Sequence, residues 1–403
     1  MHTHHHHPTG DATPAWRHLR ALVVTIGVAT VIAGALLWPR GHGPDPINAG
    51  DTREVDATIA NVDHGRCPSV EVQGADTDCQ LVTATVTSGP TKGESAYLEA
   101  RDIDFAIPVL HASDHVVLRY TPTSPVPYQY SFADFQRAKP IAALVALFTI
   151  VVLVIGRGLG LRSLIGLAAS LAIILSFALP SLLRANNALA VALVTTVAIA
   201  FIALYVAHGI NAATTVALMG TLVSLGVIVA LAAIFISWAK LTGLSDESAQ
   251  VLRVTASAID PRGLLLAGTV IGALGVLDDI TVTQVAAVVE LRATNADLDT
   301  TTLYRRAIRI GRDHIASTVN TLILAYVGAS LPLALYFTQS GQRASRVATR
   351  EVVAAEIVRT LAGSIGLVLA VPVTTALAVH LLKPAPTSSA GNGPTWDDFA
   401  PDQ

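Results

Sequence analysis

Two adjacent carboxylates stand in the middle of an apolar segment. Residues 272–284 read GALGVLDDITVTQ, so Asp278 and Asp279 follow the glycines and branched apolar residues typical of a transmembrane helix. A charged side chain at the bilayer centre costs about 2.5–3.5 kcal/mol on insertion scales. Two neighbouring carboxylates do not both stay ionised in a dry site. The pair therefore indicates a site that handles a proton or a cation. The competing interpretation is an acid that only bonds neighbouring helices.

The surroundings of the two acids differ in a helical projection of residues 264–290. The stripe of Asp279 consists of small and polar residues: Gly268, Gly272, Gly275, Asp279, Thr283, Ala286 and Glu290. Glycine stripes let a neighbouring helix come close, so we expect Asp279 to point into the helical bundle. Asp278 borders an apolar stripe. It is either protonated or shares the polar pocket of Asp279 from its edge.

Polar residues on one other apolar segment offer partners for these acids. In the segment 316–338, Asn320 and Thr321 can donate hydrogen bonds to a carboxylate. The predicted ion- or substrate-binding residues are Asp279, Asp278, Thr283, Asn320, Thr321 and Glu290. Glu356 and Arg359 lie one turn apart, which predicts a structural ion pair. We predict no catalytic residues, no metal ligands and no cofactor.

The overall composition indicates the class of protein in which these residues lie. Of the 403 residues, 52% are hydrophobic and 14% are charged, whereas soluble domains contain about 25% charged residues. The apolar residues form runs long enough to cross a hydrocarbon core of about 30 Å. A net charge of −3 gives no reason to expect a nucleic-acid partner. The composition predicts a multi-pass membrane protein.

The domain organisation follows from the distribution of apolar runs. We expect an all-α polytopic bundle of about eight transmembrane helices and a small β-barrel-like or sandwich-like module. The expected domains are a disordered tail at 1–18, a signal-anchor helix at 19–38, the β module at 41–138, a seven-helix domain at 140–382 and a disordered tail at 383–403. The seven spans are predicted at 140–156, 162–183, 188–207, 212–239, 264–290, 316–338 and 356–382.

Two independent signals predict the topology. Arginines and lysines are modestly concentrated on one side, most clearly in the loop 291–315, which predicts cytoplasmic termini. Cys67 and Cys79 are the only cysteines and fall in the polar stretch 41–138. If that stretch is extracytoplasmic, a disulfide between them is the natural interpretation, and two free thiols are the alternative.

Three motifs resemble the YibE/F family of multi-pass membrane proteins. They read GALGVLDDITVTQVAAVVEL, GRDHIASTVNTLILAYVGASLP and EIVRTLAGSIGLVLAVPVT, in family order. The aspartate of the family's first motif falls on Asp279, whereas Asp278 stands where a hydrophobic residue is usual. The matching positions are Glu290, Asp313, Asn320, Glu356 and Arg359. The resemblance implies an integral membrane protein of the bacterial envelope and supplies no reaction.

The sequence supports two functions of different kinds. The first is a transporter or permease that uses the intramembrane carboxylates for proton or cation coupling. The second is a non-transporting envelope factor, in which the β module binds a protein partner and the helices anchor it in the lipid bilayer. An intramembrane aspartyl protease is disfavoured, because the two aspartates are adjacent on one helix instead of facing each other. We therefore expect no enzyme. The sequence does not specify an oligomeric state.

Overall fold

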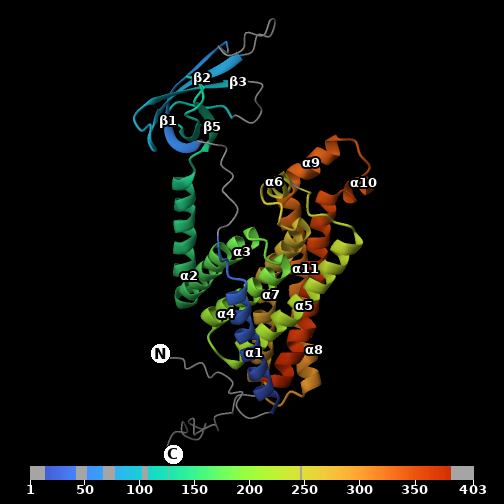
Figure 1. The fold of residues 1–403 in the computed structure, drawn as a ribbon. Helices are drawn as coiled ribbons and strands as arrows, with labels where there is room; N and C mark the ends of the chain where they lie inside the picture. Colours follow the sequence, from blue (N-terminus) through green and yellow to red (C-terminus); the bar gives the residue numbers. More distant parts are fainter. Residues whose placement is uncertain are drawn as a thin grey trace, which may run out of the picture. The chain divides into compact units, whose positions relative to one another are not determined.

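The computed structural model describes residues 14–41, 52–66, 78–101, 108–126, 128–245 and 247–382. The chain divides into two compact units. The first unit comprises residues 1–44 and 156–403 and holds most of the helices, and the second comprises residues 45–155 and holds all the described strands (Figure 1). The predicted tails fall largely outside the described residues, as does Cys67. No disulfide is present within the described ranges, so the Cys67–Cys79 bond stays a prediction.

The second unit is a five-stranded antiparallel sheet that curls into a half-barrel. Its strands are β1 (Arg53–Arg66), β2 (Asp78–Val86), β3 (Ser95–Arg101), β4 (His115–Tyr120) and β5 (Tyr130–Phe135), in the order β3-β2-β1-β4-β5. The long β1 is central, and it shifts register between Ile59 and Asn61. Because side chains alternate along a strand, Val55, Ile59 and Leu118 all reach one buried core. The predicted small β module is confirmed in this form.

The first unit is a helical bundle. Its helices are α1 (Pro14–Leu36), the C-terminal part of α2 (Ala138–Ile173), η1 (Ile174–Ala178), α3 (Leu179–Leu183), α4 (Ala188–His208), α5 (Ala212–Trp238), α6 (Glu247–Thr255), α7 (Pro261–Thr294), α8 (Thr300–Ala329), α9 (Leu331–Gln339), α10 (Ala344–Ala348) and α11 (Glu351–Leu381). Local signals set the helix starts. The side chains of Asn187, Asn211, Asp260 and Asp299 accept hydrogen bonds from the first turns of α4, α5, α7 and α8, respectively.

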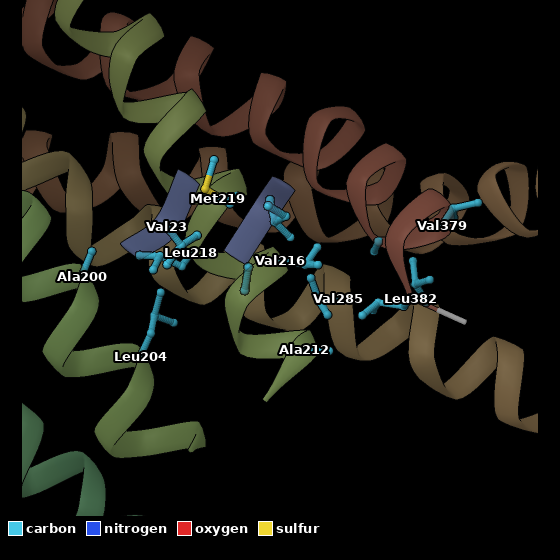
Figure 2. Close-up of a cluster of buried hydrophobic side chains, with 14 of the residues drawn as sticks. Val23, Ala200, Leu204, Ala212, Val216, Leu218, Met219, Val285, Val379 and Leu382 are labelled. Atoms are coloured by element: carbon cyan, nitrogen blue, oxygen red, sulfur yellow. The ribbon is translucent and has the colours of Figure 1, made fainter. Parts of the chain in front are cut away.

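The centre of the bundle is formed by α5, α7 and α11, which pack on one another, while α4 and α8 pack on the outside of this trio. Figure 2 shows one buried cluster, to which α1, α4, α5, α7 and α11 contribute side chains such as Val23, Leu204, Val216, Val285 and Val379. Glycine permits the closest helix contact. A Cβ atom on Gly220 of α5 would lie 2.1 Å from Oγ1 of Thr374 on α11. This approach fixes α5 against α11.

The predicted count of about eight membrane spans is not confirmed. Six helices are long and apolar enough to cross a membrane, or up to seven if α8 and α9, bent by 62°, form one span. The difference from eight arises in α2, which continues through η1 and α3 as one stretch of 46 residues. Arg157 interrupts this stretch with non-helical backbone angles. The sequence prediction places two separate spans there.

Candidate functional site

A groove of about 440 Å³ runs between the C-terminal part of α2, α4 and α7. Apolar side chains form most of its walls. Its polar lining consists of Ser163, Ser170, His208, Asp278 and Asp279. The hydroxyl of Ser170 donates to the carbonyl of Gly166 on its own helix, so it is already satisfied. The two aspartates are therefore the strongest groups in the groove for binding a proton or a cation.

The two aspartates differ in burial, because adjacent helical residues point about 100° apart. The side chain of Asp279 is 68% exposed. Asp278 is half-buried, and its Oδ1 atom is buried without a hydrogen-bond partner among the described residues. This reverses the sequence expectation, in which Asp279 points into the bundle and Asp278 lies at its edge. The reason is that no described helix packs closely on the glycine stripe that carries Asp279.

The glycine stripe does not hold a close helix contact. A Cβ atom added at Gly268, Gly272 or Gly275 would meet nothing within 4 Å among the described residues. Close contacts occur at Gly220, Gly311 and Gly366 instead. At Gly311 of α8, an added Cβ would lie 2.7 Å from Oε1 of Gln284. The prediction from glycine positions alone therefore assigned the wrong packing face to α7. The larger apolar residues of α7 set that face.

The structure brings a histidine on α8 close to Asp279. Nε2 of His314 lies 3.5 Å from Oδ2 of Asp279, and the His314 side chain is 38% exposed. The sequence reasoning proposed Asn320 and Thr321 as partners, but the structure does not bring them to the acids. Thr321 donates to the carbonyl of Ser317, and the exposed Asn320 side chain bonds to none of the described residues.

The remaining predicted residues lie at separate places. The hydroxyl of Thr283 donates to the carbonyl of Asp279, within its own helix. Glu290 is exposed near the C-terminal end of α7. Nη1 of Arg359 donates to Oε1 of Glu356 at 2.6 Å, so these two residues form an ion pair one turn apart on α11. Neither Glu290 nor the ion pair lines the groove.

Sequence reasoning missed a buried polar layer beside the groove. Thr281 of α7 shares a hydrogen bond of 2.8 Å with Thr221 of α5. Gln284, on the next turn of α7, donates to Oγ1 of Thr375 at 2.7 Å and to the carbonyl of Ala307 at 3.0 Å. The signal was present in the same motif, because Thr281 and Gln284 follow Asp278 at steps of three residues. This layer ties α5, α8 and α11 to the helix that carries the aspartates.

Comparison with known proteins identifies the helical part of the chain. Neither a search of curated proteins nor a search of solved structures gives a match. A family profile described as YibE/F-like protein matches residues 144–384, which is more than half of the chain. The match includes α7, α8 and α11 and therefore the groove and the polar layer. The chain belongs to the YibE/F family.

Proposed function

We propose that this membrane protein transports a proton or a small cation through the groove between α2, α4 and α7. The observation that carries the proposal is the pair Asp278 and Asp279 in the wall of that groove. A buried carboxylate oxygen without a partner, such as Oδ1 of Asp278, is costly unless a proton or cation satisfies it. Ionisable groups inside membrane helices commonly mark ion pathways. Because both aspartates line the groove, a small ion in the groove would meet this pair.

The two acids divide the work in this proposal. Asp279 is the more accessible group and meets the ion first, with Nε2 of His314 3.5 Å from its Oδ2 atom. Asp278 is the inner group, because its free oxygen lies deeper in the wall. Two carboxylates side by side repel each other when both are charged, so binding of one cation or proton lowers the energy of the pair. Release then requires the groove to change shape or hydration.

The test uses the full chain reconstituted in liposomes. A pH-sensitive dye inside the vesicles reports proton flux, and radioactive sodium reports cation flux. We expect flux above that of empty liposomes, a loss of at least about tenfold in Asp278→Asn and Asp279→Asn, and partial retention in Asp278→Glu. Asp297→Asn changes an exposed carboxylate in the α7–α8 loop and should keep the wild-type rate. Wild-type flux equal to empty liposomes, or unchanged flux in both asparagine variants, contradicts the proposal.

A second candidate function concerns the β unit, which we propose binds an envelope protein partner. Within the described part of the chain, the edge strands β3 and β5 have no hydrogen-bonded neighbour on one side, and Tyr97 on β3 is 56% exposed. Unpaired strand edges accept an added strand from another chain. In this function the helices serve as an anchor. Deletion of residues 41–138 distinguishes the two candidate functions. If the helices only anchor the β unit, the deletion abolishes the function of the protein. If the groove conducts ions, ion flux stays measurable after the deletion.

The proposed orientation places both termini in the cytoplasm and residues 41–138 outside it. The bias of arginines towards the loop 291–315 supports this orientation. The expected disulfide between Cys67 and Cys79 belongs to the same proposal, since such bonds persist in oxidising compartments. Labelling of intact cells with an impermeant maleimide after reduction tests both points. Labelling only after the cells are opened contradicts the orientation.

A further inference from the structure

Helix α8 buries only one side of its surface. Leu303, Ala307 and Gly311 form its buried stripe, which faces α7 and α11. The opposite side has a second stripe with spacings of three and four residues. This outward face of α8 consists of Arg309, Asp313, Ser317, Asn320, Leu324 and Gly328, all exposed in the described part of the chain. Four of these six residues are polar or charged, and two of the four, Ser317 and Asn320, fall within the predicted span 316–338.

The contacts of α8 with α7 fix the depth of this face. Ala307 of α8 bonds to Gln284, and His314 lies beside Asp279, so the two helices run in opposite directions. Asp279 is close to the middle of α7, a membrane-length helix of 34 residues. Asn320 lies about 9 Å beyond His314 along α8. Asn320 is therefore within the central part of the span.

A single asparagine exposed at this depth requires a partner. Arg309 can extend its long side chain towards the membrane surface, but the short side chain of Asn320 cannot. Its amide loses hydrogen bonds to water and gains none from acyl chains. The apolar helical segment 141–155 of the second unit offers only one polar side chain, Thr149, whose hydroxyl already donates to Val145. No described part of this chain satisfies the amide.

We propose that the outward face of α8 is the interface of a homodimer in the membrane. Two copies of one sequence insert in the same orientation, so their symmetry axis runs along the membrane normal. Residues near such an axis meet their own copies at equal depth. An asparagine amide both donates and accepts, so Asn320 pairs with the second copy's Asn320. Polar pairs of this kind favour association of transmembrane helices.

The charges on the same face are self-complementary. Arg309 and Asp313 are one turn apart and exposed. In a parallel helix pair, a residue of one helix reaches residues three or four positions away on the other helix. Arg309 of one copy can therefore meet Asp313 of the second copy, and the reverse pair forms at the same time. Leu324 and Gly328 continue the face with an apolar side chain and an open glycine, which allow close packing. Lipid offers no such complement.

Oxidative cross-linking in native membranes tests the interface directly. We expect Leu324→Cys to give a disulfide-linked dimer of twice the chain mass. Val223→Cys is the matched control, because Val223 is 43% exposed on α5 near the level of Thr221 and Thr281. It should remain at the baseline that the wild-type cysteines set. The proposal is overturned if folded Leu324→Cys protein gives no disulfide-linked dimer. It is also overturned if the mass of the cross-linked product indicates a different protein.

The strength of association gives a second test that does not depend on cysteine chemistry. We expect Asn320→Leu to raise the dimer dissociation constant in lipid bilayers roughly threefold to thirtyfold, the range of one interhelical hydrogen bond. Association is measured by energy transfer between labelled full-length chains at varied protein-to-lipid ratios. Val223→Leu should leave the constant unchanged. A wild-type chain that stays monomeric at every ratio overturns the proposal, and so does an Asn320→Leu variant that associates as tightly as the wild type. The inference is independent of ion transport.

Discussion

Asp279 on α7 and His314 on α8 lie 3.5 Å apart between Oδ2 and Nε2 and connect the groove to the outer helix. This pair joins two motifs that are separated in the sequence by a charged loop. It also puts a histidine, in place of the expected Asn320 or Thr321, next to the more accessible acid. The identity of the partner matters, because histidine can be neutral or positively charged near neutral pH.

The Asp279–His314 contact should contribute a measurable coupling energy. A double-mutant cycle with Asp279→Ala and His314→Ala is expected to give about 0.6 kcal/mol, and at most about 1.7 kcal/mol, as for other interhelical polar contacts in membranes. Unfolding by denaturing detergent in mixed micelles measures it. A second cycle that pairs Asp279→Ala with Thr321→Ala is the control and should give no coupling. The reverse ranking of the two cycles would favour the sequence-based partner.

Two glycines should respond in opposite ways to the same substitution. Gly220→Ala should lower the free energy of unfolding by about 1–3 kcal/mol, because its new Cβ would collide with Thr374. Gly268→Ala should be neutral or slightly stabilising, since nothing lies within 4 Å and alanine favours helix more than glycine does. Thermal unfolding of the purified protein measures both. Equal destabilisation of the two variants would contradict the helix packing described above.

The buried amide of Gln284 should be important for stability. Gln284→Leu removes the donor to the Ala307 carbonyl and to Thr375, both of which are buried. The expected loss is about 1–3 kcal/mol of unfolding free energy. Gln250→Leu on α6 is the matched control, because Gln250 is exposed, and its effect should stay within about 0.5 kcal/mol. A larger loss in the control would show that residue type, and not burial, determines the effect.

The start of α8 should lose stability in acid. Hydrogen bonds from the Thr302 hydroxyl and from the backbone of Thr302 and Thr301 lower the pKa of the exposed Asp299 carboxyl. Because the folded pKa is below the unfolded one, this stabilisation is complete above about pH 4 and is lost as the pH falls through the folded pKa. Asp299→Asn keeps an N-cap acceptor without titrating. The stability difference between wild type and Asp299→Asn should therefore shrink below about pH 4, as measured by thermal unfolding. A constant difference across that range would contradict the assignment.

Hydropathy predicted the membrane bundle and the approximate positions of most helices. The predicted span 188–207 agrees with α4 to within one residue, and 212–239 agrees equally well with α5. The start of α8 was missed by sixteen residues, since the span was predicted at 316–338 and the helix begins at Thr300. This part of α8 carries arginines on one side, so its average hydropathy is low even though Leu303 and Ala307 are buried.

The candidate site was predicted in part. The sequence identified Asp278 and Asp279, because charged residues in an apolar run are conspicuous. It could not rank them, since their burial depends on which face of α7 the neighbouring helices cover. It also could not find His314 or the contribution of α4, because contacts between distant segments leave no spacing pattern in one sequence.

The one-sided burial of α8 has a mechanical consequence. The fully buried residues of the helix lie between Leu303 and Gly311, whereas Ile315 and Val319 are only partly buried against the core. Any tilt of α8 about the segment near Ala307 would therefore displace its C-terminal half most. A tilt of about 10° would move Asn320 by roughly 3 Å and Ala307 hardly at all, because roughly 13 residues of helix span about 20 Å. His314 lies between these two points, so the same tilt would change its separation from Asp279.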